Sequence, residues 1–178
     1  STENLHTKPK DELQSLFDLY TEGLLEIAQD ERIHTKGVKV RVIGKIEQLP
    51  DKLRDAIEYA ESRTSAYKNH TFTVCLAYGS REEILGAIKE IAIAHSKGEL
   101  PLDSITIDEV SKRLYTKDLP DPDMIIRTSG EERISNFLLW QSAYSELFFV
   151  DTYWPSFTRR EFLKSIFSYQ RRRRRYGS

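Results

Sequence analysis

The sequence predicts an α/β fold in which a mostly parallel central sheet is flanked by helices. Two observations predict this class: some segments repeat apolar residues at helical spacing, and short apolar or β-branched runs alternate with them along the chain. Strand–helix–strand alternation favours right-handed crossovers and therefore parallel strands with both faces covered. In such sheets ligands bind beyond the carboxyl ends of the strands, so the loops that follow the strands are the first places to search.

The first predicted helix covers residues 9–29, because apolar residues recur there every three or four positions. Alternating apolar residues predict the first strand, and capping-box spacing at Ser80 and at Thr106 marks the starts of two later helices. We expect strands over residues 38–43, 71–77, 124–126 and 147–150, and further helices over 50–66, 80–97, 106–115 and from 158 into the arginine run.

Length and composition are those of an ordinary globular chain. Its 178 residues suit a single domain over residues 1–178 and can bury a sizeable core. A single cysteine, Cys75, excludes a disulfide framework and any cysteine-based zinc site, which favours a reducing, cytoplasmic location. The four histidines show no metal-ligand spacing, and the glycine patterns of common nucleotide sites are absent.

The net charge of −1 conceals a strong asymmetry. Residues 159–178 contain eight Lys or Arg and one Glu, a net charge of +7, so the first 158 residues carry −8. A basic end on an acidic body suggests an anionic partner, which could be nucleic acid, a membrane surface or a phosphorylated ligand. Few aromatic residues accompany the arginine run at 171–175, so a nucleic-acid site has weak support.

The densest polar segment, residues 127–136, directly follows the predicted strand at 124–126. Its arginines Arg127 and Arg133, with Ser135 and Gly130, could surround an oxyanion such as diphosphate. Guanidinium groups provide fixed donors, and glycine lets backbone N–H groups approach an anion closely. The alternative interpretation is a solvated loop with a surface ion pair.

Glu146 lies among apolar residues, where a carboxylate is costly unless it has a partner. That partner could be an arginine or a hard cation such as Mg²⁺, which binds few carboxylates together with phosphate oxygens. The surrounding residues alone favour the arginine.

These motifs together resemble a known family. The run Pro122–Gln141, with Tyr144–Leu147 and Trp154-Pro155 after it, is similar to the C-terminal signature of cis-prenyltransferases, the undecaprenyl diphosphate synthase family. Shorter matches are Ser1–Asn4 to the family's Ser-Thr-Glu-Asn, Ala77–Arg81 to Asn-Tyr-Gly-Gly-Arg, and Arg175–Gly177 to Arg-X-Gly.

The family's upstream Asp-Gly-Asn-Gly-Arg-Trp loop has no counterpart in the sequence. We therefore expect the chain to be the C-terminal part of a longer polypeptide, without the first strand and at least one helix of the domain.

The resemblance implies a diphosphate and metal site in the second half of the chain. Arg127, Arg133 and Ser135 would bind the diphosphate of isopentenyl diphosphate, and Glu131 would orient the neighbouring arginines. Glu146 would help to hold Mg²⁺, which reverses the preference for an arginine partner. The implied enzyme adds isopentenyl diphosphate to an allylic diphosphate and makes a long polyprenyl diphosphate.

The resemblance also assigns roles to both ends of the chain. Ser1 and Asn4 would line the reaction centre, whereas Arg175 and Gly177 would reach across a homodimer interface to the partner's diphosphate. A peripheral membrane contact is expected for an enzyme with a lipid product, and nucleic acid is not an expected partner.

The apolar product requires apolar walls, for which we consider Leu16, Tyr20, Leu24, Val74 and Leu76, although each could simply be a core residue. The Ala77–Arg81 variant looks archaeal or eukaryotic, so both farnesyl and geranylgeranyl diphosphate stay open as the primer. The alternative function is a non-catalytic partner subunit of a heteromeric enzyme. Such subunits usually lose the arginines and the glutamate that are present here.

Overall fold

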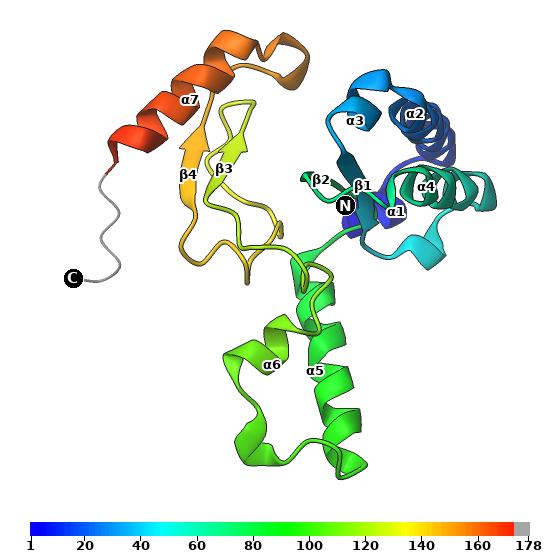
Figure 1. Ribbon diagram of the computed structural model, residues 1–178, viewed down its shortest axis with the longest axis vertical. Helices are drawn as coiled ribbons and strands as arrows, with labels where there is room; N and C mark the ends of the chain where they lie inside the picture. The colour runs from blue at the N-terminus through cyan, green and yellow to red at the C-terminus, as the bar shows by residue number, and fades with distance from the viewer. Residues whose placement is uncertain (173–178) are drawn as a thin grey trace. The chain divides into compact units, whose positions relative to one another are not determined.

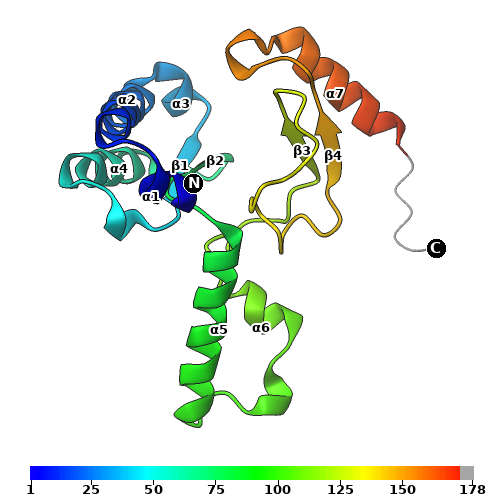
Figure 2. The same cartoon turned by 180° about the vertical axis from the view of Figure 1, so that it is seen from behind.

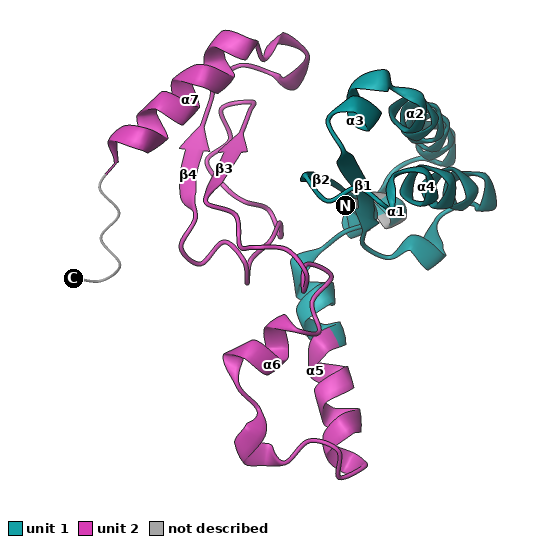
Figure 3. Cartoon of the chain, in the orientation of Figure 1, with its two compact units in different colours: residues 1–86 teal, residues 87–178 magenta. Residues whose placement is uncertain are grey.

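The computed structural model describes residues 1–172, with the side chains of Asn4 and His6 left out (Figure 1). It contains two compact units, residues 1–86 and 87–178, and the boundary between them falls inside helix α5 (Figure 3). Each unit contains one pair of parallel strands. The α/β class with parallel strands is confirmed, whereas the single domain over residues 1–178 stays a prediction.

The first unit follows the predicted order of helices and strands closely. Its elements are α1 (Thr2–Thr7), α2 (Lys10–Gln29), α3 (Glu31–Thr35), β1 (Val38–Ile43), the 3-10 helix η1 (Ile46–Gln48), α4 (Asp51–Thr64), β2 (His70–Cys75) and the start of α5 (Ser80–Ser96). Sequence periodicity did not indicate the short helices α1 and α3, because neither spans two full turns.

The core of the first unit lies where α2 and α4 pack together beside strand β1, as Figures 1 and 2 show from opposite sides. Strands β1 and β2 pair in parallel from Val38 opposite His70 to Ile43 opposite Cys75. Leu24, Val40 and Leu53 are almost completely buried there. Burying each such side chain contributes about 1.5–3 kcal/mol, so the apolar stripes seen in the sequence build this core.

Side chains of α4 occupy the second edge of β1, where no strand pairs within the described residues. The amide of Val40 donates to Thr64 Oγ1 at 2.9 Å, and the amide of Val42 donates to Glu61 Oε1 at 2.7 Å. These bonds satisfy backbone donors that an edge strand would otherwise expose.

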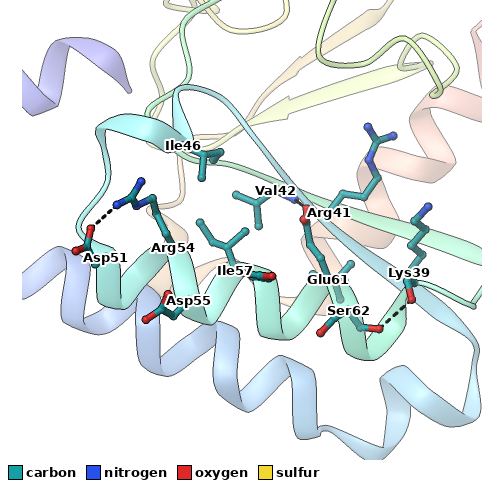
Figure 4. Close-up of a pocket in the computed structure, with 13 residues that line it drawn as sticks. Lys39, Arg41, Val42, Ile46, Asp51, Arg54, Asp55, Ile57, Glu61 and Ser62 are labelled. Carbon is teal, nitrogen blue, oxygen red and sulfur yellow. Dashed lines mark hydrogen bonds and ion pairs between the residues drawn. The ribbon is translucent and has the colours of Figure 1, made fainter.

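An open groove of about 1060 Å³ runs beside this edge, and Figure 4 shows side chains of both charges along it. The mixture of Lys39, Arg41 and Arg54 with acidic residues gives the groove no preference for either sign of ligand charge.

Gly44, directly after β1, is expected to tolerate no side chain. Its φ is +129°, and an added Cβ would lie 1.9 Å from the carbonyl oxygen of Leu76. Replacing Gly44 with alanine should therefore reduce the free energy of unfolding by about 2–5 kcal/mol, from overpacking plus backbone strain. Urea unfolding measures this loss.

Gly23 in α2 provides the matched control, because nothing lies within 4 Å of a Cβ added there. Gly23→Ala should raise stability by about 0.5–1 kcal/mol, since alanine loses less entropy in a helix. Equal unfolding midpoints for the two variants would show that the close approach at Gly44 is not a constraint.

The second unit contains the other strand pair and the last long helix. Its elements are the end of α5, η2 (Leu102–Ser104), α6 (Ile107–Ser111), β3 (Met124–Arg127), β4 (Glu146–Phe149), η3 (Trp154–Ser156) and α7 (Arg159–Arg171). Helix α7 begins with a capping box: Glu161 N donates to Thr158 Oγ1, and Thr158 N donates to Glu161 Oε2. Within residues 1–172, no helix is both long and apolar enough to cross a membrane.

The structure differs from the sequence prediction in two respects, one in a helix of this unit and one in the sheets of both units. The helix predicted over 106–115 ends at Ser111. After it the chain continues in turns, in which the amides of Lys117 and Leu119 each donate to the carbonyl three residues earlier. The described strands form two separate two-stranded sheets, β1–β2 and β3–β4, where one central sheet was predicted.

Candidate active site

The segment that follows β3 gathers the polar residues singled out in the sequence. Arg127 is the last residue of β3, and its Nη1 donates to Ser135 Oγ at 2.8 Å and to the carbonyl oxygen of Arg133. Two residues eight positions apart are thereby brought together at the carboxyl end of a parallel strand. A guanidinium anchored in this way is held at a fixed orientation, and its planar fork suits an oxyanion such as phosphate that can accept two hydrogen bonds side by side.

The backbone of this segment is strained at several positions. Ser129, Ser135, Asn136 and Leu138 all have positive φ, between 43° and 77°. A left-handed conformation costs a non-glycine residue about 1–2 kcal/mol. Strain of this kind persists only where the surroundings enforce it, and it clusters at binding and catalytic sites.

Two backbone donors near the start of the segment are engaged within the protein. The amide of Ser129 donates to the carbonyl of Thr152 at 2.9 Å, and the amide of Gly130 donates to that of Val150 at 3.0 Å. These two N–H groups are therefore used inside the fold, and oxyanion binding by the segment stays a prediction. Gly130 suits its position because its φ is +70° and an added Cβ would lie 3.2 Å from Asp151 Oδ1.

Arg133 and Glu131 form an ion pair on the surface of the segment. Both side chains are largely exposed, at 64% and 42%, so the pair contributes little to stability. The pairing gives Glu131 the means to orient an arginine, as the resemblance implies. That role stays a prediction, as does diphosphate binding by Arg133.

Glu146 lies at the opposite end of the strand pair from Arg127. In the parallel register Glu146 faces Met124, whereas Arg127 faces Phe149. Three residues of strand, at about 3.3 Å each, separate the two positions by about 10 Å along the sheet. Within the second unit, the structure therefore brings Arg127 and Ser135 together but does not bring Glu146 to them.

An arginine does accompany Glu146, as its apolar neighbours suggested. Arg172 Nη1 donates to Glu146 Oε2 at 2.5 Å, and the Arg172 guanidinium lies over the Phe148 ring, 4.2 Å from its centroid. Sequence reasoning did not single out Arg172, because a partner 26 residues away leaves no periodic signal. Arg175 and Gly177, which the resemblance assigns to the diphosphate site of a partner subunit, lie outside the described residues.

Glu146 fits a magnesium site only if a bound substrate supplies further oxygen ligands. In the part of the chain that the structure describes, no group of three or more His, Cys, Asp or Glu side chains could hold a metal. Mg²⁺ is, however, commonly held by one or two carboxylates together with waters and substrate phosphates. A lone carboxylate such as Glu146 fits that mode, in which diphosphate oxygens supply the other ligands.

The start of the chain lies beside the loop after β2. The amide of Thr2 donates to the carbonyl of Tyr78 at 3.3 Å. Ser1 lines a small cavity, described below, and Asn4 is part of α1 with its side chain outside the description. The reaction-centre roles of Ser1 and Asn4 stay predictions.

The loop Tyr78–Arg81 is tightly built. Tyr78 Oη donates to Glu83 Oε2 at 2.5 Å, and Ser80 and Glu83 are both buried. Burial, and then the bond to Glu83, raise the pKa of Tyr78 well above its ordinary value. The capping-box spacing that starts at Ser80 includes Glu83, but it gives no sign of the bond to Tyr78 five residues earlier.

An apolar cavity of about 50 Å³ lies between α1, α2 and the end of β2 in the first unit. It is lined by Ser1, Leu5, Leu13, Leu16, Phe17, Tyr20, Leu49, Cys75, Leu76 and Ala77. Of the residues considered as walls for an apolar product, Leu16, Tyr20 and Leu76 line this cavity. Leu24 and Val74 instead belong to the core and its border.

Comparisons with known proteins agree with the motifs. The family model described as "Putative undecaprenyl diphosphate synthase" matches residues 1–177. Two relatives are named tritrans,polycis-undecaprenyl-diphosphate synthase (geranylgeranyl-diphosphate specific). The one from Picrophilus torridus is 48% identical and the one from Methanocaldococcus jannaschii is 50% identical. Each match covers 99% of this chain, but 69% and 64% of the respective relative, so the chain spans about two thirds of their length.

Two solved structures share the fold. The lavandulyl diphosphate synthase of Lavandula x intermedia, solved with dimethylallyl diphosphate, has a TM-score of 0.94 and 33% identity, over 99% of this chain and 75% of that one. A probable undecaprenyl diphosphate synthase from Campylobacter jejuni has a TM-score of 0.81 and 34% identity, over 99% and 79%. With the signature at residues 122–155 and a family match along nearly its whole length, the chain belongs to the undecaprenyl diphosphate synthase family of cis-prenyltransferases.

Proposed function

We propose that this protein is a Mg²⁺-dependent cis-prenyltransferase that adds isopentenyl diphosphate to an allylic diphosphate primer and makes a long polyprenyl diphosphate. The observation that carries the proposal is the anchored guanidinium of Arg127, which contacts Ser135 at the carboxyl end of β3 inside the family signature. Ligands of parallel α/β sheets bind at such strand ends.

The proposed reaction needs cationic groups held in place. The allylic C–O bond breaks and diphosphate leaves, the double bond of isopentenyl diphosphate forms the new C–C bond, and a proton departs to leave a cis double bond. Two diphosphates must lie near one another, so fixed positive charges must offset their repulsion. Arg127 and Arg133 would bind and orient the diphosphate of isopentenyl diphosphate.

Glu146 would hold the metal together with diphosphate oxygens, once its carboxylate is released from Arg172. When bound, Mg²⁺ would neutralise diphosphate charge. We further propose a homodimer, in which Arg175 and Gly177 complete the diphosphate site of the partner subunit.

We propose geranylgeranyl diphosphate as the primer. Both relatives described above are named as geranylgeranyl-diphosphate specific. The apolar cavity beside Ser1 is the candidate place for the hydrocarbon chain. Its 50 Å³ is smaller than such a chain, so the cavity would have to widen to admit it.

Cys75 reports on this cavity. Burial, supported by the negative charge of Glu83, raises the pKa of the Cys75 thiol to about 11. At pH 8 only about one thiol in a thousand is then ionised, so iodoacetamide should react slowly and faster as the pH rises toward 11. Geranylgeranyl diphosphate should slow the labelling further by filling the cavity, which mass spectrometry measures.

Inorganic diphosphate is the control for the labelling experiment, because it has the charged group without the hydrocarbon chain. It should leave the labelling rate at Cys75 unchanged. If geranylgeranyl diphosphate at saturating concentration also left the rate unchanged, the chain would not enter this cavity.

The proposed function is tested by measuring the incorporation of radiolabelled isopentenyl diphosphate into long lipids by the natural gene product. Each primer is tested separately, in the presence of Mg²⁺ and in the presence of a chelator. We expect incorporation with Mg²⁺ only, and higher kcat/KM with geranylgeranyl than with farnesyl diphosphate. Incorporation that persists in the chelator would refute the metal requirement. No incorporation alone, but stimulation of a second cis-prenyltransferase subunit, would support the non-catalytic alternative.

A further inference from the structure

Helix α7 has an apolar pair on its outward face. Ser165 is buried, which marks the inward side of the helix, whereas Leu163 and Phe167 are 50% and 59% exposed. Because these two residues are four positions apart, they lie next to each other on one face. An exposed leucine–phenylalanine pair on the face of the helix opposite Ser165 calls for a contact that the described chain does not supply.

Basic side chains surround this pair. They form the rim of a shallow hollow of about 510 Å³, which is lined by Arg159, Arg160, Leu163, Lys164 and Phe167. At the far end of the helix, the Arg171 guanidinium lies 5.5 Å from the centroid of the Phe167 ring. Four cations therefore lie around two apolar side chains.

No acidic side chain opposes these cations within α7, all of which is described. Its one acidic residue, Glu161, is engaged by Thr152 Oγ1 at 2.5 Å and by the Thr158 amide at 2.7 Å. Those hydrogen bonds also lower the pKa of Glu161, so it stays ionised and bound. The face is thus uniformly basic, and its partner must be anionic.

We propose that this outward face of α7 docks on the surface of an anionic lipid bilayer. A basic amphipathic helix binds such a surface by burying its apolar side chains at the headgroup level while its cations meet anionic lipids. A second copy of the same face would bring like charges together, which disfavours a symmetric contact. The apolar pair at the centre favours lipid over a nucleic acid. A nucleic acid would be bound through phosphate contacts and base stacking, and neither of these uses a leucine side chain.

This inference goes beyond the proposed function, because the condensation itself requires no bilayer. The docking would keep the enzyme at the lipid bilayer, into which a product with a long hydrocarbon chain partitions.

Vesicle flotation tests the docking, with vesicles of phosphatidylcholine alone and of phosphatidylcholine mixed with phosphatidylglycerol. We expect binding to the mixed vesicles only, and weaker binding as salt is added. Arg160→Gln/Lys164→Gln and Leu163→Ser/Phe167→Ser should each reduce that binding by about tenfold or more.

Matched controls come from exposed residues of the first unit. Lys52→Gln/Arg63→Gln removes the same charge, and Leu19→Ser removes an apolar side chain that is 61% exposed; both should bind vesicles like the parent. Equal binding to both kinds of vesicle, or α7 variants that bind like the controls, would overturn the proposal. A change in sedimentation of the α7 variants without a change in vesicle binding would also overturn it and assign the face to a contact between copies.

No turnover takes part in the flotation measurement. Its failure therefore leaves the proposed function standing, and an inactive protein could still bind the vesicles.

Discussion

Arg127→Ala is expected to weaken the binding of isopentenyl diphosphate, and to lower kcat/KM, by about a hundredfold or more. The guanidinium is anchored by Ser135 Oγ at 2.8 Å and by the Arg133 carbonyl, so its remaining donors are held in a fixed direction. Hydrogen bonds to a charged group are each worth about 1.5–3 kcal/mol, and a diphosphate would lose about two of them. Calorimetry with isopentenyl diphosphate and steady-state kinetics measure the two quantities.

Arg127→Lys separates charge from geometry. A lysine keeps the positive charge, but its single ammonium group cannot contact Ser135, the Arg133 carbonyl and a diphosphate in the same planar arrangement. We therefore expect it to recover only part of the lost affinity. Full recovery would mean that a point charge suffices and that the anchoring contacts are incidental.

Two further variants show how specific the effect is to Arg127. Ser135→Ala removes one neutral anchor of Arg127 and should cost about 0.5–1.5 kcal/mol in binding, much less than the arginine. Arg63→Ala removes an exposed arginine in the first unit and should change nothing. If Arg127→Ala melted like the parent and also kept its KM, the diphosphate assignment at this strand end would fail.

Local patterns determined the elements that the sequence predicted correctly. Strand β1 was predicted with the bounds that it has, and α2 to within one residue, because alternation and the three-to-four spacing are properties of consecutive residues. Arg127 at the end of β3 was found for the same reason: a polar segment directly follows an apolar run.

Features that depend on distant partners could not be read from one sequence. The amides of Ser129 and Gly130 bond to Thr152 and Val150, twenty or more residues away, so their use inside the fold was not predictable. Left-handed backbone at Ser135 and Leu138 also has no signal in the residue type, since glycine or asparagine normally marks such positions. Glu146 is a further example, because its apolar neighbours predict that it has a partner but do not identify that partner.

Glu146→Gln tests whether this carboxylate has a role beyond its ion pair. The pair with Arg172 is partly exposed, with 25% and 43% of the two side chains accessible, so losing it should cost about 0–1 kcal/mol of stability. Turnover should instead fall by about a hundredfold or more, and half-maximal rate should need far more Mg²⁺, because an amide is a much poorer ligand for a hard cation.

Arg172→Ala is the matched variant, since it breaks the same ion pair but leaves the carboxylate in place. If Glu146 serves only Arg172, both substitutions should have the same small effects on melting and none on the Mg²⁺ dependence. If Glu146 holds the metal, Arg172→Ala should keep the metal dependence and need less Mg²⁺ for half-maximal rate, because the carboxylate no longer has to leave an arginine. Opposite shifts of the Mg²⁺ requirement in the two variants therefore distinguish a metal ligand from a structural ion pair. This test does not depend on the position of Glu146 relative to Arg127, which the strand register places about 10 Å away along the sheet.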